Sequence, residues 1–200
     1  GNFTRAELSA LGAVVEYLDI TQKGKLPLLR PPMREAEAGV MQIDAATRRN
    51  LELTHSLSGG RGGSLLSAID RTVTAGGARL LERRLSSPSR NLETVENRLE
   101  SVGFLHNHGR LASDLRETLR KVSDLDRALS RLALDRGGPR DLAAIRNGLE
   151  QAEQIAHLID NQELPALLAD AARDLAGHGD LLDLLGQSLV AEPPLLVRDG

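Results

Sequence analysis

The chain has 200 residues and a formal net charge of -3. That length is enough to bury a real core, and a net negative charge argues against a general polyanion binder. Trp is absent, and only two Phe and one Tyr are present, so Leu, Ala, Val and Ile must build the core. Because Leu and Ala are strong helix formers, the composition predicts a mainly all-α, multi-helix fold with at most one or two short strands.

Several classes of protein are excluded by what the sequence lacks. The absence of Cys rules out disulfides, thiolate catalysis and Cys-based metal sites, and it fits a reducing cytoplasm. No apolar run approaches the roughly 20 residues of a membrane span. The opening Gly-Asn-Phe-Thr-Arg is not typical of a signal peptide. We therefore expect a cytoplasmic localisation and no membrane partner.

The first predicted unit, residues 1–35, is a helix followed by a linker. Thr4 and Glu7 have the spacing of a capping box, and apolar residues follow at helical spacing. This pattern predicts a helix from about Thr4 to Ile20. Gly24 and the prolines after it end the helix and hold the next stretch extended.

The second predicted unit, residues 36–138, is a helical core. Residues 40–43 alternate like a short strand, and Asp44 is placed to cap a helix that continues to Leu53. We expect Gly76 and Gly77 to weaken the path into the helix that follows them. Further helices are predicted at 64–69, 79–85, 91–109, 111–122 and, capped by Ser123 or Asp124, to residue 134.

The third predicted unit, residues 139–200, contains the longest clean pattern. Gly137 and Gly138 break the chain, and Pro139 suits the first turn of a helix that continues to Asp160. Its apolar stripe follows coiled-coil spacing over nearly three heptads: Leu142, Ile145, Leu149, Ala152, Ala156 and Ile159. Two shorter helices are predicted at about 165–176 and 180–190.

The glycine-rich loop at residues 59–64 invites a phosphate-binding interpretation because it precedes a helix. It lacks the Gly-Lys-Ser/Thr ending of a phosphate loop, and Leu65 stands where a dinucleotide fingerprint needs its third glycine. We therefore expect a tight loop with a helix cap.

A locally basic stretch is the only candidate nucleic-acid surface. Its arginines are Arg61, Arg71, Arg79, Arg83, Arg84 and Arg90, against only Asp70 and Glu82. The alternative is that these side chains lie on ordinary solvated helix faces. A steep salt dependence of DNA binding would favour the first interpretation.

No active site is predicted. His106 and His108 are two apart and point in different directions on a helix, while His55, His157 and His178 are scattered. No Ser, His and acid arrangement stands out. We therefore assign no catalytic, cofactor-binding or metal-binding residues.

Several segments of the chain are distinctive when taken together. The most specific of them is residues 43–53, with the sequence IDAATRRNLEL. The others are 10–18, 63–66, 69–74, 77–81, 124–127, 139–142 and 198–200. As a set, these segments resemble the MutS family of mismatch-repair proteins. The resemblance covers nearly the whole chain.

The resemblance implies a division of labour. One end of such a protein reads the mismatch and the other hydrolyses ATP with Mg, while a core or lever domain between them carries conformational change. By the resemblance, this chain corresponds to the core and lever of such a protein. Residues 1–35 enter from the connector side, and residues 139–200 end at the approach to a DNA clamp. Implied partners are mismatched double-stranded DNA, the other domains and a second subunit of the parent. The chain alone is then not an enzyme and holds no cofactor.

An alternative function remains open at this point: the chain could be a helical protein–protein interaction module that dimerises through the 142–159 stripe. The exposure of that stripe is also open. By the resemblance, the stripe packs in the parent against a returning helix, so it is a candidate for exposure and self-association here. The alternative is that the acidic helices with Leu181, Leu184 and Leu185 fold back and cover the stripe.

Overall fold

A computed structural model describes residues 3–23, 29, 31–32 and 39–194. Within these residues the chain forms helices and no strand of a sheet, which confirms the all-α expectation. The helices are α1 (Arg5–Thr21), α2 (Ala45–Asn50), α3 (Leu65–Ile69), α4 (Ala75–Ser86), α5 (Leu92–Asn107), α6 (Gly109–Arg120), α7 (Leu125–Ala133), α8 (Pro139–Ile159), α9 (Ala166–Asp174) and α10 (Gly179–Ser188).

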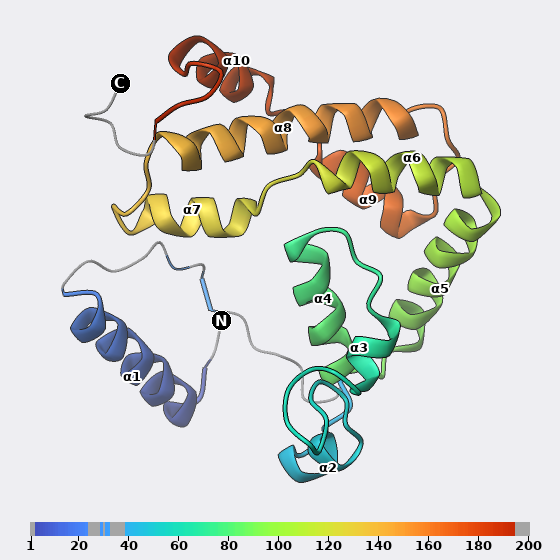
Figure 1. Cartoon of the computed structure of the whole chain (residues 1–200). Coiled ribbons are helices and arrows are strands. Elements are labelled where there is room, and N and C mark those ends of the chain that lie inside the picture. Colours follow the sequence, from blue (N-terminus) through green and yellow to red (C-terminus); the bar gives the residue numbers. More distant parts are fainter. Residues whose placement is uncertain (1–2, 24–28, 30, 33–38, 195–200) are drawn as a thin grey trace.

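Helix α1 begins with the predicted capping box. The Glu7 amide donates to the Thr4 hydroxyl at 3.3 Å, and the Thr4 amide donates to the Glu7 carboxylate at 2.6 Å. None of its residues is buried, and Figure 1 shows α1 standing apart from the other helices. The helix is thus specified by its own sequence rather than by packing.

Helix α2 is shorter than predicted. Asp44 caps it as expected, through the Thr47 amide at 2.8 Å, but the helix ends at Asn50 instead of reaching Leu53. At Glu52 the backbone has a φ of 49°, which turns the chain out of the helix. The carbonyls of residues 52 and 53 then accept from the amides of residues 65 and 66, both at 2.9 Å, so the chain closes a loop against α3.

The short strand predicted at residues 40–43 is wrong. Val40 forms only one isolated antiparallel bridge, with Ser89 in the connection between α4 and α5. The Met41 amide donates to the Pro88 carbonyl at 2.8 Å. Proline has no amide to donate in return, so no ladder extends from this bridge.

The expected break at Gly76 and Gly77 is also wrong, because α4 begins at Ala75 and runs through both glycines. They occupy its first turn, where backbone amides have no partner within the helix. The Thr74 hydroxyl accepts from the Gly77 amide at 2.9 Å and caps this turn. The pair therefore does not lie in a connection between helices.

The long helix α8 packs against α6, α7 and α10. In Figure 1 it lies between α7 on one side and α10 on the other, with α6 against its far half. At 1.5 Å per residue, its 21 residues are about 30 Å long. Ile145 is buried together with Ala128 of α7 and Leu185 of α10.

The apolar stripe of α8 is partly covered within the chain. Ile145 is buried, the other five residues are half-buried, and Leu142 and Leu149 pack against the Ile145 cluster. The stripe is therefore not left fully exposed as expected, and the alternative of covering by the last helix is confirmed for Leu185. Leu181 and Leu184 remain exposed.

Candidate functional site

Helices α7 and α8 approach each other closely at Gly148. A Cβ built on this glycine would lie 2.4 Å from a methyl carbon of Leu125 and 2.9 Å from two more atoms of the same side chain. Gly148 is buried, although it falls outside the apolar stripe. The absence of a side chain thus allows the backbone of α8 to approach α7 closely.

The start of α8 is fastened to the end of α7. The Gly138 amide donates to the Asp141 carboxylate at 2.9 Å, and Arg131 donates to the same carboxylate at 3.0 and 3.1 Å. Partial desolvation acts in the opposite direction, but these hydrogen bonds hold the pKa of Asp141 below its ordinary value. A Cβ on Gly137 would lie 2.5 Å from Leu132, so this connection is packed as well as bonded.

The middle of α8 is tied to the end of α10 by one arginine. The Arg146 guanidinium donates to the carbonyls of residues 189, 190 and 191 at 3.2, 3.3 and 3.0 Å. These carbonyls lie at and just beyond the last turn of α10, where helical partners are lacking. One largely buried side chain therefore satisfies three backbone groups and fixes α10 against α8.

A second arginine links α4 to the start of α7. The Arg79 guanidinium donates to both oxygens of Asp124, at 2.9 and 2.8 Å, and to Asp126 at 2.9 Å. The bond from Arg79 holds the pKa of Asp124 below its ordinary value. Both carboxylates are also favourably placed at the amino-terminal end of α7, where they interact with the positive end of the helix dipole.

The predicted basic stretch is partly neutralised. Arg61 pairs with Glu82 at 2.7 Å, and Arg79 is taken by α7. Partial burial, and then the charges of Arg98 and Arg83, lower the pKa of Arg84. Of the six arginines, two are thus engaged with carboxylates and are poorly placed to contact a phosphate backbone.

The glycine loop is a tight loop with a helix cap, as expected. The Ser56 amide donates to the Gly60 carbonyl at 3.0 Å, and the Gly59 amide donates to the Ser56 carbonyl at 3.1 Å. The Ser64 hydroxyl accepts from the Ser67 amide at 3.1 Å and caps α3. These amides therefore serve the loop itself rather than a phosphate.

The histidines are placed as follows. His108 stacks on Phe104 at the bend between α5 and α6, with ring centroids 4.2 Å apart. His157 and His178, which sequence spacing had left unconnected, line one cavity together with Glu153. Among the described residues, no group of three His, Asp or Glu is arranged to hold a metal ion. None of the described helices is both long and apolar enough to span a membrane.

The contacts that sequence analysis missed involve residue types that carry no periodic signal. Gly148 and Gln151 are buried on α8, three and six residues after Ile145, yet neither side chain is apolar enough to be counted in a hydrophobic stripe. Arg146 is polar and lies on the same helix, so its position gave no indication of a partner more than 40 residues away.

These contacts define a helical domain organised around one long helix. The MutS domain III family model matches residues 46–200, and the chain belongs to this family. It is 72% identical over its full length to the DNA mismatch repair protein MutS of Ruegeria pomeroyi, and 68% and 64% identical to the proteins of that name from Cereibacter sphaeroides and Roseobacter denitrificans. The chain spans 23% of the length of each.

Proposed function

We propose that this chain is the core and lever segment of a mismatch-recognition protein, and that α8 carries displacement between the DNA-binding and ATPase parts of that protein. In this proposal residues 1–35 form the helix and linker on the connector side, 36–138 the helical core, and 139–200 the lever.

The attachment of α8 along its length is the observation that supports this role. Asp141 fastens its start, Gly148 seats its middle against α7, and Arg146 holds α10 to it. A helix has all its internal backbone hydrogen bonds satisfied, so it resists bending. A displacement applied at one end is then passed to the packed neighbours instead of being absorbed locally.

The remaining parts of the function belong to the parent protein. We propose that ATP and Mg are bound outside this chain, that mismatched duplex DNA and a second subunit are partners of the whole protein, and that it acts in the bacterial cytoplasm. The interaction-module alternative loses support because no residue of the 142–159 stripe is fully exposed and Ile145 is buried within the chain.

A pair of substitutions in the full-length parent tests the lever role. Glu153 and Gln154 are exposed on α8. Changing both to Gly makes the free energy of helix formation about 2 kcal/mol less favourable than changing both to Ala, because Gly is the weaker helix former. Coupling between sites is commonly worth 1–3 kcal/mol. We expect the Gly pair to reduce the stimulation of ATPase by mismatched DNA at least about threefold, and the Ala pair to preserve it.

Two readouts make the result interpretable. Hydrogen exchange should be faster in α8 of the Gly pair, and mismatch affinity and basal ATPase should match those of the Ala pair. If α8 exchanges faster while stimulation is unchanged, the lever role is wrong.

A further inference from the structure

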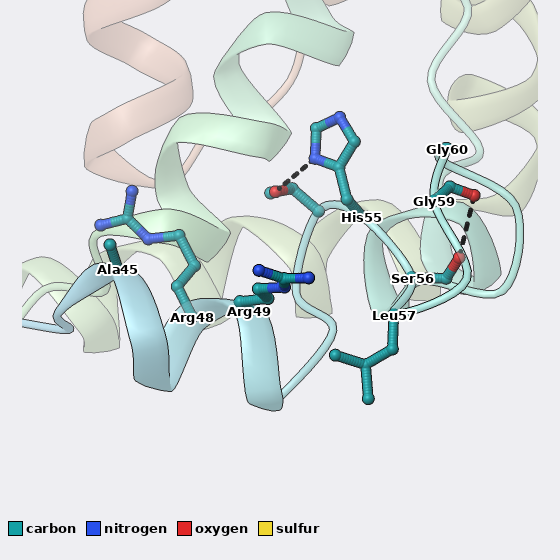
Figure 2. Close-up of a pocket in the computed structure, with 9 residues that line it drawn as sticks. Ala45, Arg48, Arg49, His55, Ser56, Leu57, Gly59 and Gly60 are labelled. Carbon is teal, nitrogen blue, oxygen red and sulfur yellow. Dashed lines mark hydrogen bonds between the residues drawn. The ribbon is translucent and has the colours of Figure 1, made fainter.

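A pocket of about 420 Å³ lies between α2 and the loop that follows it. Figure 2 shows Arg48 and Arg49 rising from α2 on the side where His55 leaves the loop. Thr54 and Leu57 also line the pocket. The loop is held in place by the hydrogen bonds between residues 52–53 and 65–66, so the lining comes from two connected and fixed pieces of backbone.

The pocket is basic and carries no carboxylate of its own. The two nearest acids in sequence are already engaged: Asp44 accepts from the Thr47 amide and hydroxyl at 2.8 and 2.7 Å, and Glu52 accepts from the Leu57 amide at 2.6 Å. Within the described part of the chain, neither Arg48 nor Arg49 has an ion-pair partner. The pocket therefore presents two guanidinium groups to whatever enters it.

Arg48 is the more constrained of the two. One of its terminal nitrogens donates to the Ile43 carbonyl at 3.2 Å, which holds the side chain along α2. Its Nε is buried and has no acceptor among the described residues. The Arg48 side chain is thus fixed along α2 at the pocket, and a carboxylate is the group that a guanidinium pairs with best, often through two hydrogen bonds.

The apolar part of the lining argues for a peptide rather than a bare anion. Leu57 lines the pocket and is 57% exposed, and Figure 2 shows its side chain pointing down from the loop, away from the side on which Arg48 and His55 rise. A small inorganic anion would leave this side chain in water, whereas a peptide can place a carboxylate on the arginines and an apolar side chain on Leu57. The relatives are more than four times as long as this chain, so most of such a protein lies outside it.

We infer that this pocket binds an acidic segment of the parent polypeptide from outside residues 1–200, with carboxylates paired to Arg48 and Arg49 and an apolar residue against Leu57. The inference is separate from the lever role of α8, since it rests on α2 and its loop. It makes residues 45–60 a docking surface for another part of the same protein.

A cross-linking experiment on the full-length parent tests this. Arg49→Lys keeps the positive charge and supplies an amine that a water-soluble carbodiimide joins to any carboxylate in contact with it. Arg120→Lys is the matched control, because Arg120 is also exposed in the last turn of its helix and lines no described pocket. We expect Lys at position 49 to join one acidic segment beyond residues 1–200, at least about tenfold more than Lys at position 120.

Other outcomes would overturn the inference. Cross-links from position 49 that reach only carboxylates of residues 1–200, or that are as scattered as those from position 120, exclude a dedicated acidic segment. Saturable binding of inorganic phosphate to the parent that Arg49→Gln abolishes would instead identify a phosphate site. Because α8 is untouched by these substitutions, failure here would leave the test of the lever role unaffected.

Discussion

Helices α8 and α1 are the two longest helices of the described chain, and they are stabilised in opposite ways. Helix α8 packs against α6, α7 and α10, with Ile145 buried and its first turn bonded to the Gly138 amide through Asp141. Helix α1 buries no residue, although Leu8 and Ile20 are apolar. The comparison teaches that an apolar pattern at helical spacing predicts a helix equally well in both cases. The pattern does not predict whether another segment of this chain packs on the apolar face of that helix.

Truncating one leucine on each side of the comparison should give the largest difference. Leu185 is 7% exposed in the α8 cluster, and Leu8 is 56% exposed on α1. We expect Leu185→Ala to lower the free energy of unfolding by about 2–4 kcal/mol through the lost contacts and the cavity. Leu8→Ala should change it by less than about 0.5 kcal/mol. Urea unfolding of the 200-residue chain measures both, and equal losses would contradict the comparison.

The glycines of the two helices provide the next test. Gly148→Val places atoms where Leu125 already lies and should destabilise the chain by about 1–3 kcal/mol. Gly12 in α1 has nothing within 4 Å of a Cβ position, so Gly12→Val should be neutral or stabilising by a few tenths of a kcal/mol. If thermal unfolding shows the same sign for both, the close approach at Gly148 is wrong.

A smaller effect is expected from the arginine that ties α10 to α8. Arg146→Gln removes a guanidinium that serves three carbonyls, and we expect a loss of about 1–2 kcal/mol. Arg173→Gln is the control, since Arg173 pairs with Asp170, one turn away on an exposed face of α9. That pair should contribute less than about 0.5 kcal/mol. Hydrogen exchange in α10 should accelerate in the first variant and not in the second.

Local signals account for most of what the sequence predicted correctly. Thr4, Asp44, Ser64 and Asn91 each cap the helix expected to follow, because a cap depends on residues three positions apart. The errors arise where a distant segment intervenes. Residues 40–43 alternate like a strand but meet Pro88, which cannot extend a ladder.

The contacts that hold α8 were beyond sequence reasoning for the same reason. The role of Gly148 is recognised only when Leu125 is known to pack against it. The role of Arg146 is recognised only when the carbonyls of residues 189–191 are known to lie within its reach. Leu142, Ile145 and Leu149 gave the helix and its apolar face. They gave no indication whether a helix of this chain or of another would cover that face.

The smallest expected effect is the pH dependence of the Arg79–Asp124 pair. The bond from Arg79 keeps the pKa of Asp124 below its ordinary value of 3.8. A carboxylate whose pKa is depressed by folding stabilises the folded state at every pH above its unfolded value, and this contribution is lost as the pH falls through the folded value. We therefore expect the pair to be fully effective at neutral pH and to weaken below about pH 4.

Asp124→Asn isolates this contribution because asparagine retains an oxygen that can accept from the Arg127 amide and cap α7. The free energy of unfolding of the wild type should exceed that of the variant by less than about 1 kcal/mol at neutral pH, because both side chains of the pair are partly exposed. The gap should stay constant down to about pH 5, narrow below pH 4, and shrink in about 1 M salt, which screens exposed charges. Urea unfolding across this range measures it. A gap that widens on acidification would mean that Arg79 does not hold α4 to α7 through a charged Asp124.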